Sequence, residues 1–203
     1  MIEELKAIIG ANETILYEGK PNKKCYFFES IFNPLLPFAL VWGIIDFGVI
    51  GASLFTGGAG KATTYIILFM LVHLMPVWMY LGGVLLTARR YKNTAYIVTN
   101  KAIYVSGGVF THNINTKPFA ELSHIDLHRG IFDQMFKVGD IVATTNQLNK
   151  NGKNATIIIN SVSNYIEVYN LVNKLQTDIY TDVMYPNDKR PTENHGYNTQ
   201  YRG

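Results

Sequence analysis

The sequence predicts an α+β membrane protein in which an antiparallel transmembrane helix hairpin precedes a seven-stranded antiparallel barrel or sandwich capped by a C-terminal helix. Three observations predict this fold: two long apolar stretches, a later series of short β-branched and aromatic runs, and one amphipathic stretch after the last run. The apolar residues are segregated along the chain, so the overall hydrophobic content of 48% conceals the two long stretches.

The two apolar stretches cover residues 30–56 and 63–87. Each is long enough to cross a bilayer, because about 20 apolar residues at a helical rise of ~1.5 Å span ~30 Å of hydrocarbon. Only the glycine-rich residues 57–62 separate them, so the two spans must run antiparallel. We therefore expect a transmembrane hairpin over residues 30–88, with both polar ends of the chain on one side of the membrane.

Basic residues predict which side that is. The connector between the spans offers only Lys61, whereas the outer flanks carry six basic residues: Lys20, Lys23, Lys24, Arg89, Arg90 and Lys92. The excess of lysine and arginine in cytoplasmic segments then predicts a multi-pass protein with both termini in the cytoplasm. The same residues lie where anionic headgroups would meet them, so they act either as topology determinants alone or also as lipid contacts.

The segments outside the hairpin predict one small cytoplasmic domain and two flanking pieces. Residues 1–29 are expected to form a cytoplasmic N-terminal segment with a short helix and a strand. Residues 183–203 lack apolar periodicity and are expected to be a disordered tail. Between them, residues 89–182 have room for a single soluble domain.

Within that domain the pattern of apolar and turn residues predicts a series of strands followed by one helix. Short β-branched and aromatic runs are separated by turn residues, which is typical of a small barrel or sandwich. Apolar side chains then recur at helical spacing over about residues 163–180, which predicts the capping helix. The seven expected strands are 94–99, 102–106, 109–113, 115–119, 124–128, 139–145 and 155–160.

Two blocks of this domain resemble a known family. Residues 96–99 read Tyr-Ile-Val-Thr and are followed by Lys101 and by the glycine pair 107–108, and a second block covers residues 125–127 and 136–141. These motifs resemble those of bacterial PH-domain (pleckstrin-homology-like) membrane proteins that carry an N-terminal two-helix transmembrane hairpin. The resemblance covers nearly the whole chain except the tail, and it implies a PH-like module at the bacterial cytoplasmic membrane with no established catalysis.

Asp46 and His73 are the two clear ionisable residues inside the spans. Counted outward from the connector, they lie at matching depth near the bilayer midplane on adjacent helices. A buried aspartate needs a partner rather than lipid, so we expect an intramembrane hydrogen bond or ion pair between the two. We favour an interhelical clamp over the alternative, a proton relay or substrate site of a small transporter or channel component.

No catalytic motif or metal-ligand cluster is found in the sequence, so we expect no enzymatic activity, no cofactor, no metal and no nucleic-acid partner. The resemblance to pleckstrin-homology domains suggests, as an alternative, a pocket for a lipid headgroup. Phosphoinositide-binding PH domains resemble one another in a basic cluster in the first strand turn, where this chain has Lys101 alone; Arg129 and Lys137 are the candidates that would supplement it as headgroup or ligand contacts.

The expected function is that of a membrane-anchored interaction or scaffold module at the bacterial envelope. Its expected partners are the lipid bilayer and another protein or peptide bound at a sheet edge, groove or barrel end, with homo-oligomerisation as an option. Two alternatives stay open: a small transporter or channel component that uses Asp46 and His73, and a sensor of anionic lipids.

Overall fold

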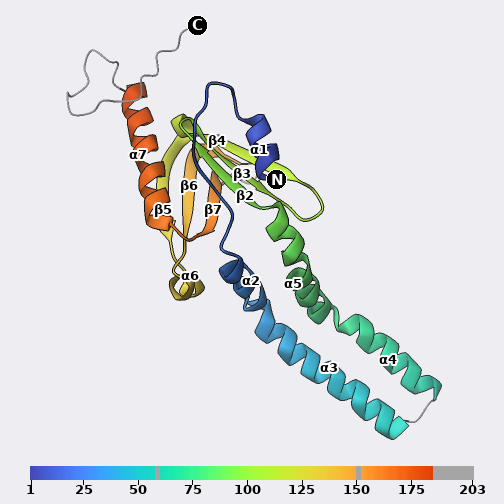
Figure 1. The fold of residues 1–203 in the computed structure, drawn as a ribbon. Helices are drawn as coiled ribbons and strands as arrows, with labels where there is room; N and C mark the ends of the chain where they lie inside the picture. Colours follow the sequence, from blue (N-terminus) through green and yellow to red (C-terminus); the bar gives the residue numbers. More distant parts are fainter. Residues whose placement is uncertain (58–59, 150–151, 185–203) are drawn as a thin grey trace. The chain divides into compact units, whose positions relative to one another are not determined.

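A computed structural model describes residues 1–57, 60–149 and 152–184 of the chain. The chain divides into two compact units (Figure 1). The sheet unit contains Met1–Tyr26 together with the chain from Arg90 onward, and the helical unit contains Phe27–Arg89. Helix α2 (Lys23–Ile31) and helix α5 (Met75–Asn93) each cross the border between the two units.

The sheet unit is built from two antiparallel sheets. The first has the strand order β1-β2-β3-β4, and the second has the order β5-β6-β7. The strands of the first sheet are β1 (Ile15–Gly19), β2 (Ala95–Thr99), β3 (Ala102–Gly107) and β4 (Asn113–Pro118). Those of the second are β5 (Leu122–His128), β6 (Gly139–Leu148) and β7 (Asn154–Val162). Two short helices, η1 (Phe119–Glu121) and α6 (Ile131–Phe136), lie on either side of β5 in the chain.

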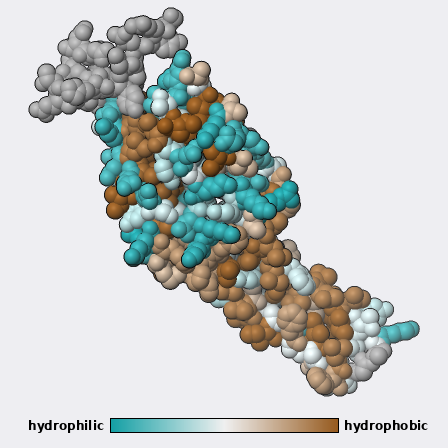
Figure 2. All heavy atoms as spheres, viewed as in Figure 1, coloured by the Kyte–Doolittle hydropathy of each residue, from teal (hydrophilic) through white to brown (hydrophobic). Residues whose placement is uncertain are grey.

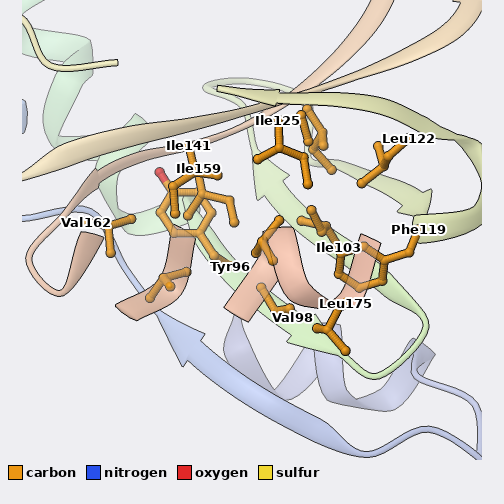
Figure 3. Packing of buried hydrophobic residues seen from close by; sticks show 14 residues of the cluster. Tyr96, Val98, Ile103, Phe119, Leu122, Ile125, Ile141, Ile159, Val162 and Leu175 are labelled. Atoms are coloured by element: carbon orange, nitrogen blue, oxygen red, sulfur yellow. The ribbon is translucent and has the colours of Figure 1, made fainter. Parts of the chain in front are cut away.

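The core lies between the sheets and helix α7 (Tyr165–Met184). Figure 3 shows side chains from β2, β5, β6, β7 and α7 converging on one cluster, with Tyr96 and Ile141 among its fully buried members. Residues of β6 alternate between buried and partly exposed over its first half, as a strand with one core-facing side requires. The apolar spacing that predicted the capping helix puts Val168, Val172 and Leu175 into this cluster.

Gly139 lets helix α7 approach the second sheet closely. A Cβ atom at this position would lie 3.0 Å from Cγ of Tyr165 and 3.2 Å from Cδ1 of Leu127, closer than ordinary van der Waals contact. This glycine opens β6 and belongs to the second motif of the sequence. Its smallness therefore has a packing reason within the fold.

The fold class is confirmed in its α+β character, its antiparallel sheets and its C-terminal helix, but the sheets do not close into a barrel. The expected strand 109–113 is wrong. The chain turns there instead, because Gly108 has a φ of +125° that is rarely adopted by other residues, and β4 begins only at Asn113.

The N-terminal segment supplies the seventh strand. β1 pairs with β2 in an antiparallel register that sets Ile15 opposite Thr99. Helix α1 (Ile2–Ile8) packs Leu5, which is fully buried, in a second cluster with Ala95 and Ile97 of β2. Residues 1–26 are therefore part of the sheet unit.

The helical unit contains α3 (Leu35–Gly57), α4 (Lys61–His73) and most of α5. By length and composition, the stretch Leu35–Thr56 of α3 is the one described helix that could cross a membrane by itself. The stretches Thr63–His73 and Met75–Asn93 meet that test only as a pair, and they are bent by 47°. The expected second span is therefore interrupted next to Pro76, whose ring and missing amide hydrogen disfavour a continuous helix.

The tail expected over 183–203 overlaps the last two described residues of helix α7. Because helix α7 continues through Met184, residues 183–184 are helical rather than part of a disordered tail, and the rest of the expected tail, residues 185–203, lies outside the residues that the structure describes.

Candidate functional site

The helical unit brings Asp46 of α3 and His73 of α4 together. The Nδ1 atom of His73 lies 2.9 Å from Oδ1 and 3.1 Å from Oδ2 of Asp46. The carboxylate is almost completely buried, with 1% of the aspartate side chain exposed, whereas 38% of the histidine side chain is exposed. The Nδ1 atom of a partly exposed imidazole therefore contacts a buried carboxylate.

Aromatic rings flank this histidine. Trp42 stacks against His73 with ring centroids 5.0 Å apart and an interplanar angle of 28°, and Phe69 stacks at 5.6 Å. Trp42 and Asp46 are four residues apart on α3, as Phe69 and His73 are on α4, so each helix presents its two side chains on one face. This spacing positions the carboxylate and the rings around one imidazole.

The break between α4 and α5 adjoins this pair. In a continuous helix, Met75, Pro76 and Val77 would donate to the carbonyls of residues 71–73. Pro76 has no amide hydrogen, and the Val77 amide donates instead to the Leu74 carbonyl at 2.9 Å. The carbonyls of Leu71, Val72 and His73 therefore need other donors.

Both tryptophans of the chain supply such donors. The indole Nε1 of Trp42 donates to the His73 carbonyl at 2.9 Å, and that of Trp78 donates to the Leu71 carbonyl at 3.0 Å. The Leu74 amide, which donates to the Met70 carbonyl at 2.9 Å, is also directed at the remaining carbonyl, that of Val72. The break is thus closed by side chains, and Trp42 joins it to the Asp46–His73 pair.

Chemically, this arrangement can hold a proton between a carboxylate and an imidazole, or it can hold two helices in register. The buried carboxylate, the flanking rings and the indole bond to the break all restrict the movement of His73. A fixed imidazole is what an interhelical clamp requires.

The six flanking basic residues are all exposed. Three of them lie between the end of β1 and the first turn of α2: Lys20, Lys23 and Lys24. The other three lie in the last turns of α5: Arg89, Arg90 and Lys92. Their charged ends reach solvent at both places where the chain leaves the sheet unit.

The three candidate headgroup contacts do not form one cluster. The Lys101 carbonyl accepts the Phe119 amide just before β5, whereas Arg129 directly follows that strand, so seven residues of extended chain separate the two ends. Arg129 is engaged locally, since its Nε donates to the Val138 carbonyl at 2.8 Å and its guanidinium lies 4.5 Å from the Tyr165 ring centroid. Lys137 is near Arg129 and is exposed, with a left-handed φ of 56° at the end of α6.

Sequence reasoning missed the aromatic rings around His73 and the helix α6. The spacing of four between Trp42 and Asp46, and between Phe69 and His73, was a usable signal for the rings. Helix α6 has six residues, which is too short for helical periodicity to be recognised.

Comparison with known families bears on this fold. The family described as Bacterial PH domain matches residues 41–176, which extend from within α3 through α4, α5 and all strands from β2 to β7 into α7. Searches of curated proteins and of solved structures found no match. Since the family match covers well over half of the sequence, the chain belongs to the bacterial PH-domain family.

Proposed function

We propose that this protein is a membrane-anchored, non-enzymatic interaction module whose PH-like sheet unit faces the cytoplasm at the bacterial envelope. The observation that carries the proposal is the exposed apolar surface of the helical unit. Only 17% of the best 18-residue apolar window within Leu35–Thr56 is buried, and side chains such as Ile44 and Phe55 are 73% and 94% exposed. The core helix of a soluble protein would be mostly buried, so a lipid environment accounts for this surface. Figure 2 shows apolar residues gathered over these helices.

A two-span hairpin is the arrangement that fits the contacts within the helical unit. Tyr80 on α5 donates to the carbonyl of Ile31, the last residue of α2, and the Asp46–His73 contact joins α3 to α4. From Ile31 at the end of α2 to Asp46 on α3 the residue numbers rise, whereas those of their partners fall from Tyr80 on α5 to His73 on α4, so the two arms run antiparallel. We take α4 and α5 together as one bent span, and the matched family region includes both.

Charge supports the cytoplasmic placement of the sheet unit. Basic residues are exposed at the two ends of the helical unit, whereas the connector carries Lys61 as its only basic residue. In a bacterial cytoplasmic membrane this difference favours an orientation with both chain ends in the cytoplasm.

The open edge of β5 is the surface that we propose for partner binding. β5 pairs with β6 along one edge, and no strand of the described residues pairs with its other edge. An extended peptide could add a strand there through main-chain hydrogen bonds, or a second copy of the chain could do so. Side chains along β5, including Asp126, are exposed and would select the partner.

Site-specific photo-crosslinking in intact membranes tests this role. A photoreactive residue at Asp126 on β5 should give a discrete adduct, and the same residue at exposed Asn170 on α7 serves as the matched control. Absence of an adduct at position 126, or the same adducts at both positions, would contradict binding at the β5 edge.

The Asp46–His73 contact favours a second candidate function, a small transporter or channel component. Exchanging both residues, Asp46→Asn with His73→Gln, keeps hydrogen-bonding groups but removes the ionisable pair. If the pair is a clamp, the double variant should assemble and crosslink at β5 as the wild type does. Loss of the cellular role with intact assembly would instead favour proton or ion movement through the pair.

The lipid-sensor alternative is tested on the whole protein. A variant with Lys101→Gln and Lys137→Gln, reconstituted with and without anionic lipid, should crosslink at β5 to the same extent in both membranes if the module is not a sensor. A crosslinking yield that depends on anionic lipid in the wild type and not in the variant would favour the sensor.

A further inference from the structure

We propose that the short helix α6 is a membrane-contacting element that places Ile131 and Met135 among the lipid headgroups of the bilayer that anchors the chain. The proposal rests on the membrane anchoring argued above. It assigns to the lipid surface a part of the sheet unit that lies outside the PH-like strands and outside the spans.

The outer face of α6 is apolar and uncovered in the described structure. Ile131 is 82% exposed and Met135 is 55% exposed, and their spacing of four places them on one side of the helix. The next residue after the helix, Lys137, is exposed as well. An apolar pair beside a cation is the pattern of an element that lies in the membrane interface.

Hydrogen bonds at both ends fix the orientation of this face. The Gly130 amide donates to Oδ2 of Asp133 at 2.8 Å, and the Val138 amide donates to the Asp133 carbonyl at 2.9 Å. Arg129 adds a bond from its Nε to the Val138 carbonyl. The helix therefore presents its two apolar side chains in a fixed direction.

The position of α6 within the sheet unit indicates what covers it. The Cys25 thiol donates to Oδ1 of the buried Asp133 at 3.6 Å, and Cys25 is one residue from Tyr26, where the first segment of the sheet unit ends. The ring of Tyr26 also contacts that of Tyr91, with centroids 5.9 Å apart, next to the start of the second segment at Arg90. Both points at which the chain leaves for the membrane, and α6, thus belong to one end of the sheet unit.

The charges at this end match an anionic lipid surface. Besides Lys137, the exposed basic residues there are those on the first turn of α2 and the last turn of α5, namely Lys23, Lys24, Arg90 and Lys92. Each basic residue near an anionic leaflet adds to the surface attraction. A lipid surface is therefore the occupant that both the apolar pair and the cations fit.

Fluorescence quenching by lipid on the full-length protein tests the contact. An environment-sensitive fluorophore is attached to the cysteine of each of two variants, Ile131→Cys and Met135→Cys. The labelled proteins are reconstituted in vesicles of phosphatidylethanolamine and phosphatidylglycerol that also contain lipids with a quencher on the upper acyl chain. The matched control is Leu148→Cys, because Leu148 is 67% exposed but lies at the far end of β6, about 30 Å of extended chain from Gly139. Wild type, whose Cys25 is buried, gives the labelling background.

We expect a blue shift and severalfold stronger lipid quenching at positions 131 and 135 than at position 148. Equal quenching at all three positions would overturn the proposal. A blue shift at 131 without lipid quenching would also overturn it, since a second copy of the chain would then cover the face. Retention of the protein in floated vesicles after an alkaline wash separates the two proposals: release overturns the anchoring itself, and retention with unquenched 131 and 135 overturns only the role of α6.

Discussion

At the scale of single residues, Glu13 ties the N-terminal segment to the first sheet. Its carboxylate accepts hydrogen bonds from the hydroxyl of Thr99 at 2.7 Å and from that of Tyr104 at 3.1 Å. Two further hydrogen bonds join the neighbouring Thr14 to Asn100. The Asn100 backbone amide donates to the Thr14 carbonyl, and the Thr14 backbone amide donates to the side-chain oxygen of Asn100. A polar residue ahead of β1 thereby holds β1 to the β2–β3 turn.

The Tyr104 hydroxyl gives this network a pH dependence. Burial, with the adjacent Glu13 carboxylate, raises the pKa of Tyr104 to about 12. An unfolded tyrosine ionises near pH ~10, so the folded state retains its proton more strongly and its contribution to stability is complete below pH ~10. We expect the free energy of unfolding to fall between pH ~10 and pH ~12, measured by denaturant titration, and to fall less in Tyr104→Phe. An identical decline in both proteins would show that Tyr104 does not contribute.

Gly108 allows a turn that other residues would strain. Its φ is +125°, and a Cβ atom there would lie 1.9 Å from the Thr111 carbonyl oxygen. We expect Gly108→Ala to lower the free energy of unfolding by about 1–3 kcal/mol, because both strain and the clash oppose it. The neighbouring Gly107→Ala is the matched control, since a Cβ there meets nothing within 4 Å. Equal thermal shifts for the two variants would contradict this explanation.

At the scale of secondary-structure elements, the break between α4 and α5 depends on Trp42. We expect Trp42→Phe to cost about 1–3 kcal/mol of stability, because it keeps a stacked ring but leaves the His73 carbonyl without its indole donor. The cost should shrink in a Pro76→Ala background, where a continuous helix lets the Val77 amide serve that carbonyl. Unfolding titrations in detergent micelles measure this double-mutant cycle, and an unchanged cost would contradict the role of the indole.

The sequence predicts individual helices and strands better than it predicts which of them pair or pack together. Apolar length and β-branched texture were enough for the long apolar helices, for most strands and for helix α7, because these signals are local, but not for the six-residue helix α6. The pairing of Ile15 with Thr99 joins segments more than 80 residues apart, and no local pattern encodes it. The same limit applies to Trp42, whose bond to the His73 carbonyl depends on how two helices meet.

At the scale of the whole molecule, a family domain and an exposed apolar helical unit occur in one chain. The PH-like strands supply an open β5 edge, and the helical unit supplies apolar surface that a bilayer would cover. If the helical unit is a membrane anchor, as proposed, the location of the domain depends on how many times the chain crosses the membrane. One crossing, by α3 alone, would place the two chain ends on opposite sides, whereas two crossings place them on the same side.

The sidedness of the C-terminus distinguishes these arrangements most directly. A fluorescent protein that matures only in the cytoplasm and a phosphatase that is active only outside it are fused in parallel at Gly203. If the chain has two spans, the fusions at Gly203 should give fluorescence without phosphatase activity. At Gly60, in the connector between the spans, an inserted phosphatase should be active and an inserted fluorescent protein should stay dark. Phosphatase activity at Gly203 would contradict the hairpin and the cytoplasmic placement of the PH-like module.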